Sequence, residues 1–147
     1  MGEMKKHLIH LCMETEEFKN YVRANKDTIF IITVCSCNIE LKQGSFTRAL
    51  LWNGKKRINA MSMHNITSAN KCALYGLLDG AKNINKAKSV ALVSSTYLGF
   101  SKCEKGKGVN SNICNQILSE LREKGCNDIT DIMVKGGTNY LKKVCGM

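Results

Sequence analysis

An Asn-Gly pair at residues 53–54 is the feature that most constrains the fold of this 147-residue chain. Asn-Gly readily adopts the positive backbone angles of a type I′ turn, which is a tight connection between two antiparallel strands. The flanking segments 45–52 and 55–63 are rich in strand-forming residues. The apolar, β-branched run 29–37 precedes them. We therefore predict a three-stranded antiparallel meander in the first half of the chain.

Helix and strand patterns alternate after this meander. The predicted elements are a helix from the capping candidates Thr67 and Ser68 to about Asn83, a strand over 88–94, a helix over 110–124, a strand over 128–135 and one helical turn at the end of the chain. A lysine- and glycine-rich loop occupies 99–108. This order predicts an α/β fold with a five-stranded mixed sheet, in which parallel strands are added to the antiparallel three and helices flank the sheet.

The start of the chain is predicted to be an extra amphipathic helix over residues 4–25, because its apolar residues recur mostly every three or four positions. We accordingly divide the chain into this helix (1–27) and an α/β domain (28–147). The apolar stripe of the helix has to be covered. It would dock on its own sheet, pair with a second copy, or meet a partner protein.

Charge and cysteine usage narrow the class of protein. The 22 basic and 12 acidic residues give a net charge of +10, which attracts polyanions such as nucleic acid, although lysines also simply keep proteins soluble. No apolar run is long enough to span a bilayer, and the first residues do not read as a secretory signal. The eight cysteines lie mostly in apolar runs. We expect a cytoplasmic protein with reduced thiols and no membrane contact.

Six short segments in order resemble those of the ribonuclease H type 1 family, and together they cover about residues 29–143. The segments are Ile32-Thr33-Val34-Cys35-Ser36-Cys37, Gly44-Ser45-Phe46 with Asn53-Gly54-Lys55, Ser68-Ala69-Asn70-Lys71-Cys72-Ala73-Leu74, Val93-Ser94-Ser95-Thr96-Tyr97, Asn110, and Val134-Lys135-Gly136. The resemblance implies a ribonuclease H-like fold, with the predicted N-terminal helix as an addition.

The resemblance also implies four positions that carry carboxylates in the family, where they hold two divalent ions that hydrolyse RNA. In this chain the matched positions are Val34, Ala73, Ser94 and Asn139, and none is acidic. Magnesium needs charged oxygen ligands, so we expect a non-catalytic protein without metal or other cofactor. The alternative is a ribonuclease whose carboxylates have moved, and the candidates for that are Glu40, Asp79 and Asp131.

A surface that binds nucleic acid would remain even when the metal ligands are lost. In the family the hybrid lies near the opening of the first helix and the loop after the fourth strand. The matching polar and basic residues here are Ser68, Asn70, Lys71, Ser95, Thr96, Lys102, Lys105, Lys107 and Asn110. Amides and hydroxyls bind phosphate and the ribose 2′-hydroxyl without metal. The plainer alternative is that these residues only cap helices and turns.

Three cysteines are predicted to lie close together. Cys35 and Cys37 share one face of a strand, and Cys72 lies on the helix expected to pack nearby. Three sulfurs would suit zinc, but the spacing is not that of a zinc finger, and we interpret them as small core residues.

The sequence therefore favours a catalytically inactive ribonuclease H-like protein that binds RNA, an RNA–DNA hybrid or a nucleic-acid-containing complex through a basic face. One alternative is a protein-interaction or dimerisation scaffold that uses the N-terminal helix. The other is the metal-dependent ribonuclease with relocated carboxylates.

Overall fold

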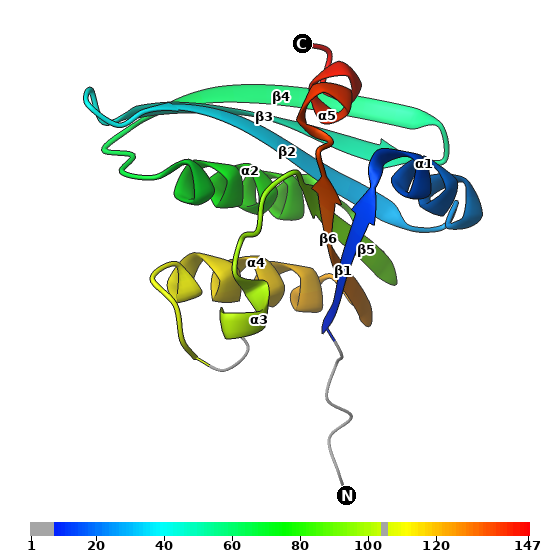
Figure 1. The fold of residues 1–147 in the computed structure, drawn as a ribbon. Coiled ribbons are helices and arrows are strands. Elements are labelled where there is room, and N and C mark those ends of the chain that lie inside the picture. The colour runs from blue at the N-terminus through cyan, green and yellow to red at the C-terminus, as the bar shows by residue number, and fades with distance from the viewer. Residues whose placement is uncertain (1–7, 104–105) are drawn as a thin grey trace, which may run out of the picture.

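A computed structural model describes residues 8–103 and 106–147, which form one mixed sheet with helices on both faces (Figure 1). The strands are β1 (Leu8–Glu14), β2 (Ile29–Asn38), β3 (Gln43–Trp52), β4 (Lys55–His64), β5 (Ser89–Ser94) and β6 (Asp128–Lys135). The helices are α1 (Thr15–Ala24), α2 (Ala69–Asn83), α3 (Phe100–Cys103), α4 (Ser111–Glu123) and α5 (Thr138–Val144). The strand order is β1-β6-β5-β2-β3-β4.

The predicted meander is confirmed. β2, β3 and β4 pair in antiparallel fashion, and Asn53 and Gly54 join the last two with φ angles of 47° and 77°. Both angles are positive, as a type I′ turn requires. β5 lies parallel to β2, and β6 lies parallel to β5. The predicted parallel additions are therefore also present.

The predicted N-terminal helix is wrong over residues 8–14, which form β1 and pair in parallel with β6. The helix begins only at Thr15, where Glu14 and Glu17 form a capping box. Residues 4–7 of the prediction lie outside the described residues. The free edge of β6 offers backbone hydrogen bonds that the sequence pattern does not reveal, and tertiary pairing overrides helical spacing. The sheet consequently has six strands instead of five.

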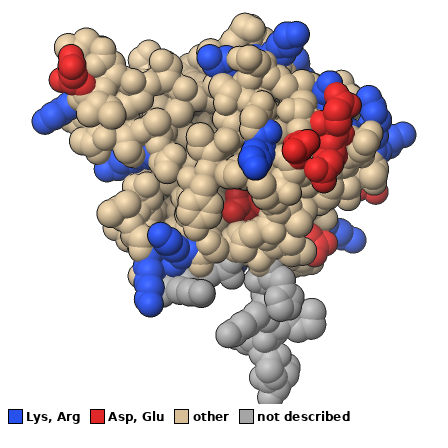
Figure 2. Space-filling model, in the orientation of Figure 1, with Lys and Arg blue, Asp and Glu red and all other residues tan. Residues whose placement is uncertain are grey.

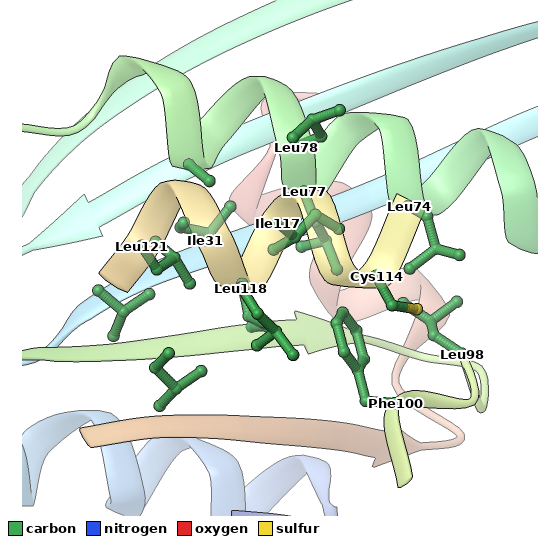
Figure 3. Close-up of a cluster of buried hydrophobic side chains, with 14 of the residues drawn as sticks. Ile31, Leu74, Leu77, Leu78, Leu98, Phe100, Cys114, Ile117, Leu118 and Leu121 are labelled. Atoms are coloured by element: carbon green, nitrogen blue, oxygen red, sulfur yellow. The ribbon is translucent and has the colours of Figure 1, made fainter. Parts of the chain in front are cut away.

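One face of the sheet is covered by α2 and α4. Their leucines and isoleucines pack with Ile31 of β2 and with Leu98 and Phe100 near α3 (Figure 3). These side chains are buried against central strands that are apolar at nearly every position, because helices cover both faces of the sheet. This layer fixes α2, whose first turn borders the candidate site.

The other face carries α1 and α5. Phe18 of α1 is fully buried and meets Phe30 of β2 edge-to-face, with 6.0 Å between ring centroids. Leu141 of α5 belongs to the same buried cluster. The apolar side of α1 therefore docks on its own sheet. No helix among the described residues is long and apolar enough to cross a membrane.

Candidate nucleic-acid interface

A pocket of about 430 Å³ opens at the carboxyl end of β5. The first turn of α2, the β5–α3 loop, α3 and the loop before α4 enclose it, which is the edge where α/β sheets commonly bind ligands. Its lining residues are Asn70, Tyr97, Leu98, Gly99, Lys102, Cys103, Gly108, Val109 and Asn110. Three of the predicted binding residues, Asn70, Lys102 and Asn110, thus meet in one hollow.

Several of the predicted residues have structural hydrogen bonds at this edge. The Ser68 hydroxyl accepts from the Lys71 backbone N–H at 3.1 Å and caps α2. The Asn70 amide donates to the Tyr97 carbonyl at 3.1 Å and so ties the β5–α3 loop to α2. These two side chains shape the pocket. The Ser68 cap confirms a sequence prediction, whereas the structural role of Asn70 was not evident from the sequence.

Ser95 and Thr96 lie in the same loop. Ser95 accepts a hydrogen bond at 2.9 Å from Thr138 at the start of α5. The Thr96 backbone N–H donates at 3.1 Å to the hydroxyl of Ser94. The loop therefore bridges α2 and α5, and it presents Thr96 to solvent.

Besides Thr96, three predicted residues have side chains available at the surface. Lys102 and Lys107 are exposed. Asn110 precedes α4, and within the described part of the chain its side chain makes no capping hydrogen bond. Lys71 is half-buried, and Lys105 lies outside the described residues. Together with the Thr96 hydroxyl, the surface-available groups are thus two ammonium groups and one amide.

Tyr97 is a lining residue that the sequence reasoning did not single out. It is 51% exposed, and its hydroxyl lies 2.8 Å from the Ser101 hydroxyl. Its position in a loop directly after a buried strand was the available signal. An exposed aromatic ring beside lysines is a surface on which a base can stack.

A second pocket of about 200 Å³ lies on the β1 and β6 side of the same loop. His10 and Asp131 line it, and His10 Nδ1 is 3.0 Å from a carboxylate oxygen of Asp131. The sequence analysis missed this pair because it assigned His10 to a helix, whereas β1 places His10 directly opposite Asp131.

The charge on the visible face is uneven. Figure 2 shows acidic side chains gathered over α1 with basic side chains beside them, whereas the side chains over the α3 and α4 side of this face are basic without acidic neighbours among the described residues. None of the described residues that line the larger pocket is acidic. The pocket rim is therefore suited to an anionic ligand.

The four positions matched to family carboxylates do not fit a pair of magnesium ions. Val34 is buried with the cluster under α1 and α5, whereas Ala73 is buried with the cluster under α2 and α4. The buried Ser94 hydroxyl donates to the Thr96 carbonyl at 2.6 Å. Asn139 is exposed in α5. Two of the four side chains offer no ligand atom, and none is charged.

The alternative carboxylates have separate surroundings. Asp79 on α2 accepts from Arg48 at 2.8 Å, Asp131 on β6 lies against His10, and Glu40 is exposed in the β2–β3 turn. Across residues 8–103 and 106–147, no group of three or more His, Cys, Asp or Glu side chains could hold a metal ion.

The predicted approach of Cys35 and Cys72 is confirmed, since Cys35 packs against the buried cluster that contains Cys72. Cys35 is half-buried, and hydrogen bonding from the Cys72 thiol lowers the pKa of Cys35 to about 7. The interaction with Cys35, followed by burial, raises the pKa of Cys72. All eight cysteines are free.

No protein-family model matches the sequence, and no curated protein matches it. Among solved structures, ribonuclease H1 from the halophilic archaeon Halobacterium salinarum NRC-1 is similar, with a TM-score of 0.56 and 11% sequence identity. The match covers 77% of this chain and 89% of that chain. At this identity the similarity establishes architecture and leaves activity open. The chain therefore has a ribonuclease H-like fold, with β1 present as a sixth strand of its sheet.

Proposed function

We propose that this protein binds RNA or an RNA–DNA hybrid at the pocket beside the β5–α3 loop and does not cleave it by two-metal hydrolysis. The observation that carries the proposal is the meeting of Asn110, Lys102 and the half-exposed Tyr97 around one pocket. The pocket lies at the edge where the strand order of a ribonuclease H-like sheet leaves parallel carboxyl ends open.

Each group has a distinct part in binding. Lys102 and Lys107 neutralise backbone phosphates, which supplies most of the salt-dependent affinity. The Asn110 amide hydrogen-bonds to a phosphate or a 2′-hydroxyl. The Tyr97 ring stacks on an unpaired or terminal base. Asn70 acts indirectly, because its hydrogen bond to the Tyr97 carbonyl holds the loop in place.

The absence of cleavage follows from the ligand chemistry. Mg²⁺ binds carboxylate oxygens, which supply the negative charge that compensates its dehydration. Val34 and Ala73 have neither oxygen nor charge in their side chains, and both are buried. A protein of this composition would hold the nucleic acid without activating a water for attack.

The test measures binding and cleavage together on a labelled RNA–DNA hybrid and on the matching single-stranded RNA. Fluorescence anisotropy gives the affinity across a salt series, and a gel reports cleavage in Mn²⁺ against a chelated control. The test variant is Lys102→Glu/Lys107→Glu. The matched control is Lys86→Glu/Lys88→Glu, which makes the same charge change at exposed positions before the amino end of β5.

We expect binding that weakens steeply with salt. Each lysine–phosphate contact that is lost should reduce the slope of log affinity against log salt by about 1. The control variant should show the same slope of log affinity against log salt as the unmodified protein. Cleavage in Mn²⁺ would overturn the non-catalytic part of the proposal. Equal losses in both variants would mean that net charge, and not this pocket, binds the nucleic acid. Salt-insensitive self-association without binding would favour the scaffold.

A further inference from the structure

We propose that Cys35 and Cys72 form a redox-sensitive thiol pair that hydrogen peroxide converts to a disulfide between β2 and the first turns of α2. This modification site stands independently of nucleic-acid binding. It rests on the placement of the two thiols, on their unequal exposure, and on the contrast with a second thiol pair in the same molecule.

The two cysteines approach each other where β2 passes beneath α2. The Cys35 thiol donates to the Ala69 carbonyl of α2 at 3.2 Å, and Cys72 lies one helical turn further along the same helix. Cys72 forms a small buried cluster with Phe46 and Ile66, and Cys35 packs against this cluster. The Cys72 thiol faces the sheet, because a Cβ added to Gly44 of β3 would lie 3.1 Å from its sulfur. The two thiols are therefore neighbours, and the Cys72 thiol is close enough to Cys35 to shift its pKa.

The exposure of the two thiols differs in the way that a reactive pair requires. Cys35 is half-buried and reachable from solvent, whereas Cys72 is fully buried. The lowered pKa of Cys35, to about 7, leaves a large thiolate fraction near neutral pH. The thiolate is the form that attacks peroxide. Cys35 is therefore the attacking residue, and Cys72 is the resolving residue.

The chemistry balances with peroxide as the oxidant. The Cys35 thiolate attacks one oxygen of hydrogen peroxide, the O–O bond breaks, and a sulfenic acid and hydroxide form. The Cys72 sulfur then attacks the Cys35 sulfur, the S–O bond breaks, and water leaves as the disulfide forms. Two thiols are oxidised by two electrons, and one peroxide is reduced to two waters. Conversion of Cys35 to the uncharged sulfenic acid removes the thiolate that raises the pKa of Cys72.

Cys103 and Cys114 provide an internal comparison. They are also neighbours, with Cys103 on α3 and Cys114 on α4 in one buried cluster. Both are buried, at 4% and 0% exposure, and burial raises the pKa of Cys114. This pair therefore has proximity without access to solvent, and the pKa of Cys114 is raised instead of lowered. It should remain reduced under conditions that oxidise Cys35 and Cys72.

The experiment treats the full folded chain with hydrogen peroxide for graded times, removes the peroxide with catalase, and alkylates the remaining thiols in denaturant. Tryptic mass spectrometry then looks for a peptide over 27–42 joined to one over 72–82. We expect this linked pair to appear before any link involving Cys103 or Cys114, and to disappear after treatment with dithiothreitol.

Variants identify which two cysteines are linked, and they show that the result does not come from unfolding. Cys37→Ser should retain the link, although Cys37 lies in the same tryptic peptide, whereas Cys35→Ser should abolish it. In Cys72→Ala, dimedone should trap a sulfenic acid at Cys35, with circular dichroism confirming the fold. The proposal is wrong if Cys35 remains fully alkylatable after peroxide, if the link goes to Cys37, or if Cys103 and Cys114 oxidise at the same rate.

Discussion

The two halves of α2 are held against the sheet by different means. At the amino-terminal end, the Ser68 hydroxyl accepts from the Lys71 backbone N–H and the Asn70 amide donates to the Tyr97 carbonyl, which fixes the first turn and the loop beside the pocket. In the carboxyl-terminal half, the backbone itself approaches the sheet. A Cβ on Gly76 would lie 2.3 Å from the Thr33 hydroxyl oxygen, and one on Gly80 would lie 2.4 Å from Ile31 Cγ2.

The carboxyl-terminal half of α2 is therefore rigidly packed, whereas the amino-terminal half borders groups that can bind or react. The half with glycines and the Arg48–Asp79 ion pair has little room for change, since close-packed contacts tolerate neither added nor removed atoms. The half with Ser68, Asn70 and Cys72 borders solvent-accessible groups that can bind or react. Changes in the first region should therefore affect stability, and changes in the second should affect binding or thiol chemistry.

The largest expected effect comes from Asp79→Ala. Asp79 accepts from Arg48 Nε at 2.8 Å and from Asn59 at 3.2 Å, and the Arg48 side chain is only 8% exposed. Removing the carboxylate leaves a buried guanidinium without its counter-charge, which costs about 3 kcal/mol. Thermal and urea unfolding should both show the loss.

Two further variants sharpen this result. Glu120→Ala removes a more exposed partner, 4.0 Å from Lys124, and should cost under about 1 kcal/mol. Arg48→Met/Asp79→Leu replaces both charges and should recover most of the stability lost in the single variant. Equal costs for Asp79→Ala and Glu120→Ala would show that burial does not distinguish the two ion pairs.

Much of the fold was predictable because its signals are local. The Asn53-Gly54 turn, the Ser68 cap and the apolar runs of β2 and β5 each depend on neighbouring residues only. β1 was not predictable in this way, because its strand form depends on the edge of β6, more than a hundred residues away in sequence. Local spacing favoured a helix, and tertiary pairing decided otherwise.

The candidate site was predictable in part for the same reason. The sequence identified Asn70, Lys102 and Asn110 by their order, and the structure brings them to one pocket. It predicted the Ser68 cap, whose partner Lys71 lies only three residues away. It could not tell that the Asn70 amide is engaged with the Tyr97 carbonyl, because those two residues become neighbours only on folding. The unequal exposure of Cys35 and Cys72 was hidden as well, since it depends on how α2 crosses β2.

A smaller effect is expected for Gly80→Ala. In an open helix, alanine is about 1 kcal/mol more favourable than glycine. Here the added methyl would overlap Ile31 Cγ2, and overpacking of this kind costs about 1–3 kcal/mol. We expect a net loss of about 1 kcal/mol in urea unfolding. Ile31→Leu, which moves the branch away from Cβ, should reduce that loss in the double variant. A gain in stability for Gly80→Ala alone would show that α2 is free to move away from the sheet.

The smallest effect, and one of opposite sign, is expected for Thr33→Val. Thr33 lies in β2 and is 2% exposed, and its hydroxyl oxygen has no hydrogen-bond partner among the described residues. The Thr33 side chain packs against Gly76 of α2, and this contact depends on the shape of the side chain. Valine has nearly the same shape as threonine. Burying an unpaired hydroxyl costs about 1–3 kcal/mol, so its removal should leave stability unchanged or raise it by about 1 kcal/mol. Thr33→Ser keeps the hydroxyl, loses the methyl, and should be destabilising. If instead valine destabilises the protein more than serine does, the hydroxyl is paired in solution, and the close contact between β2 and α2 is looser than its packing indicates.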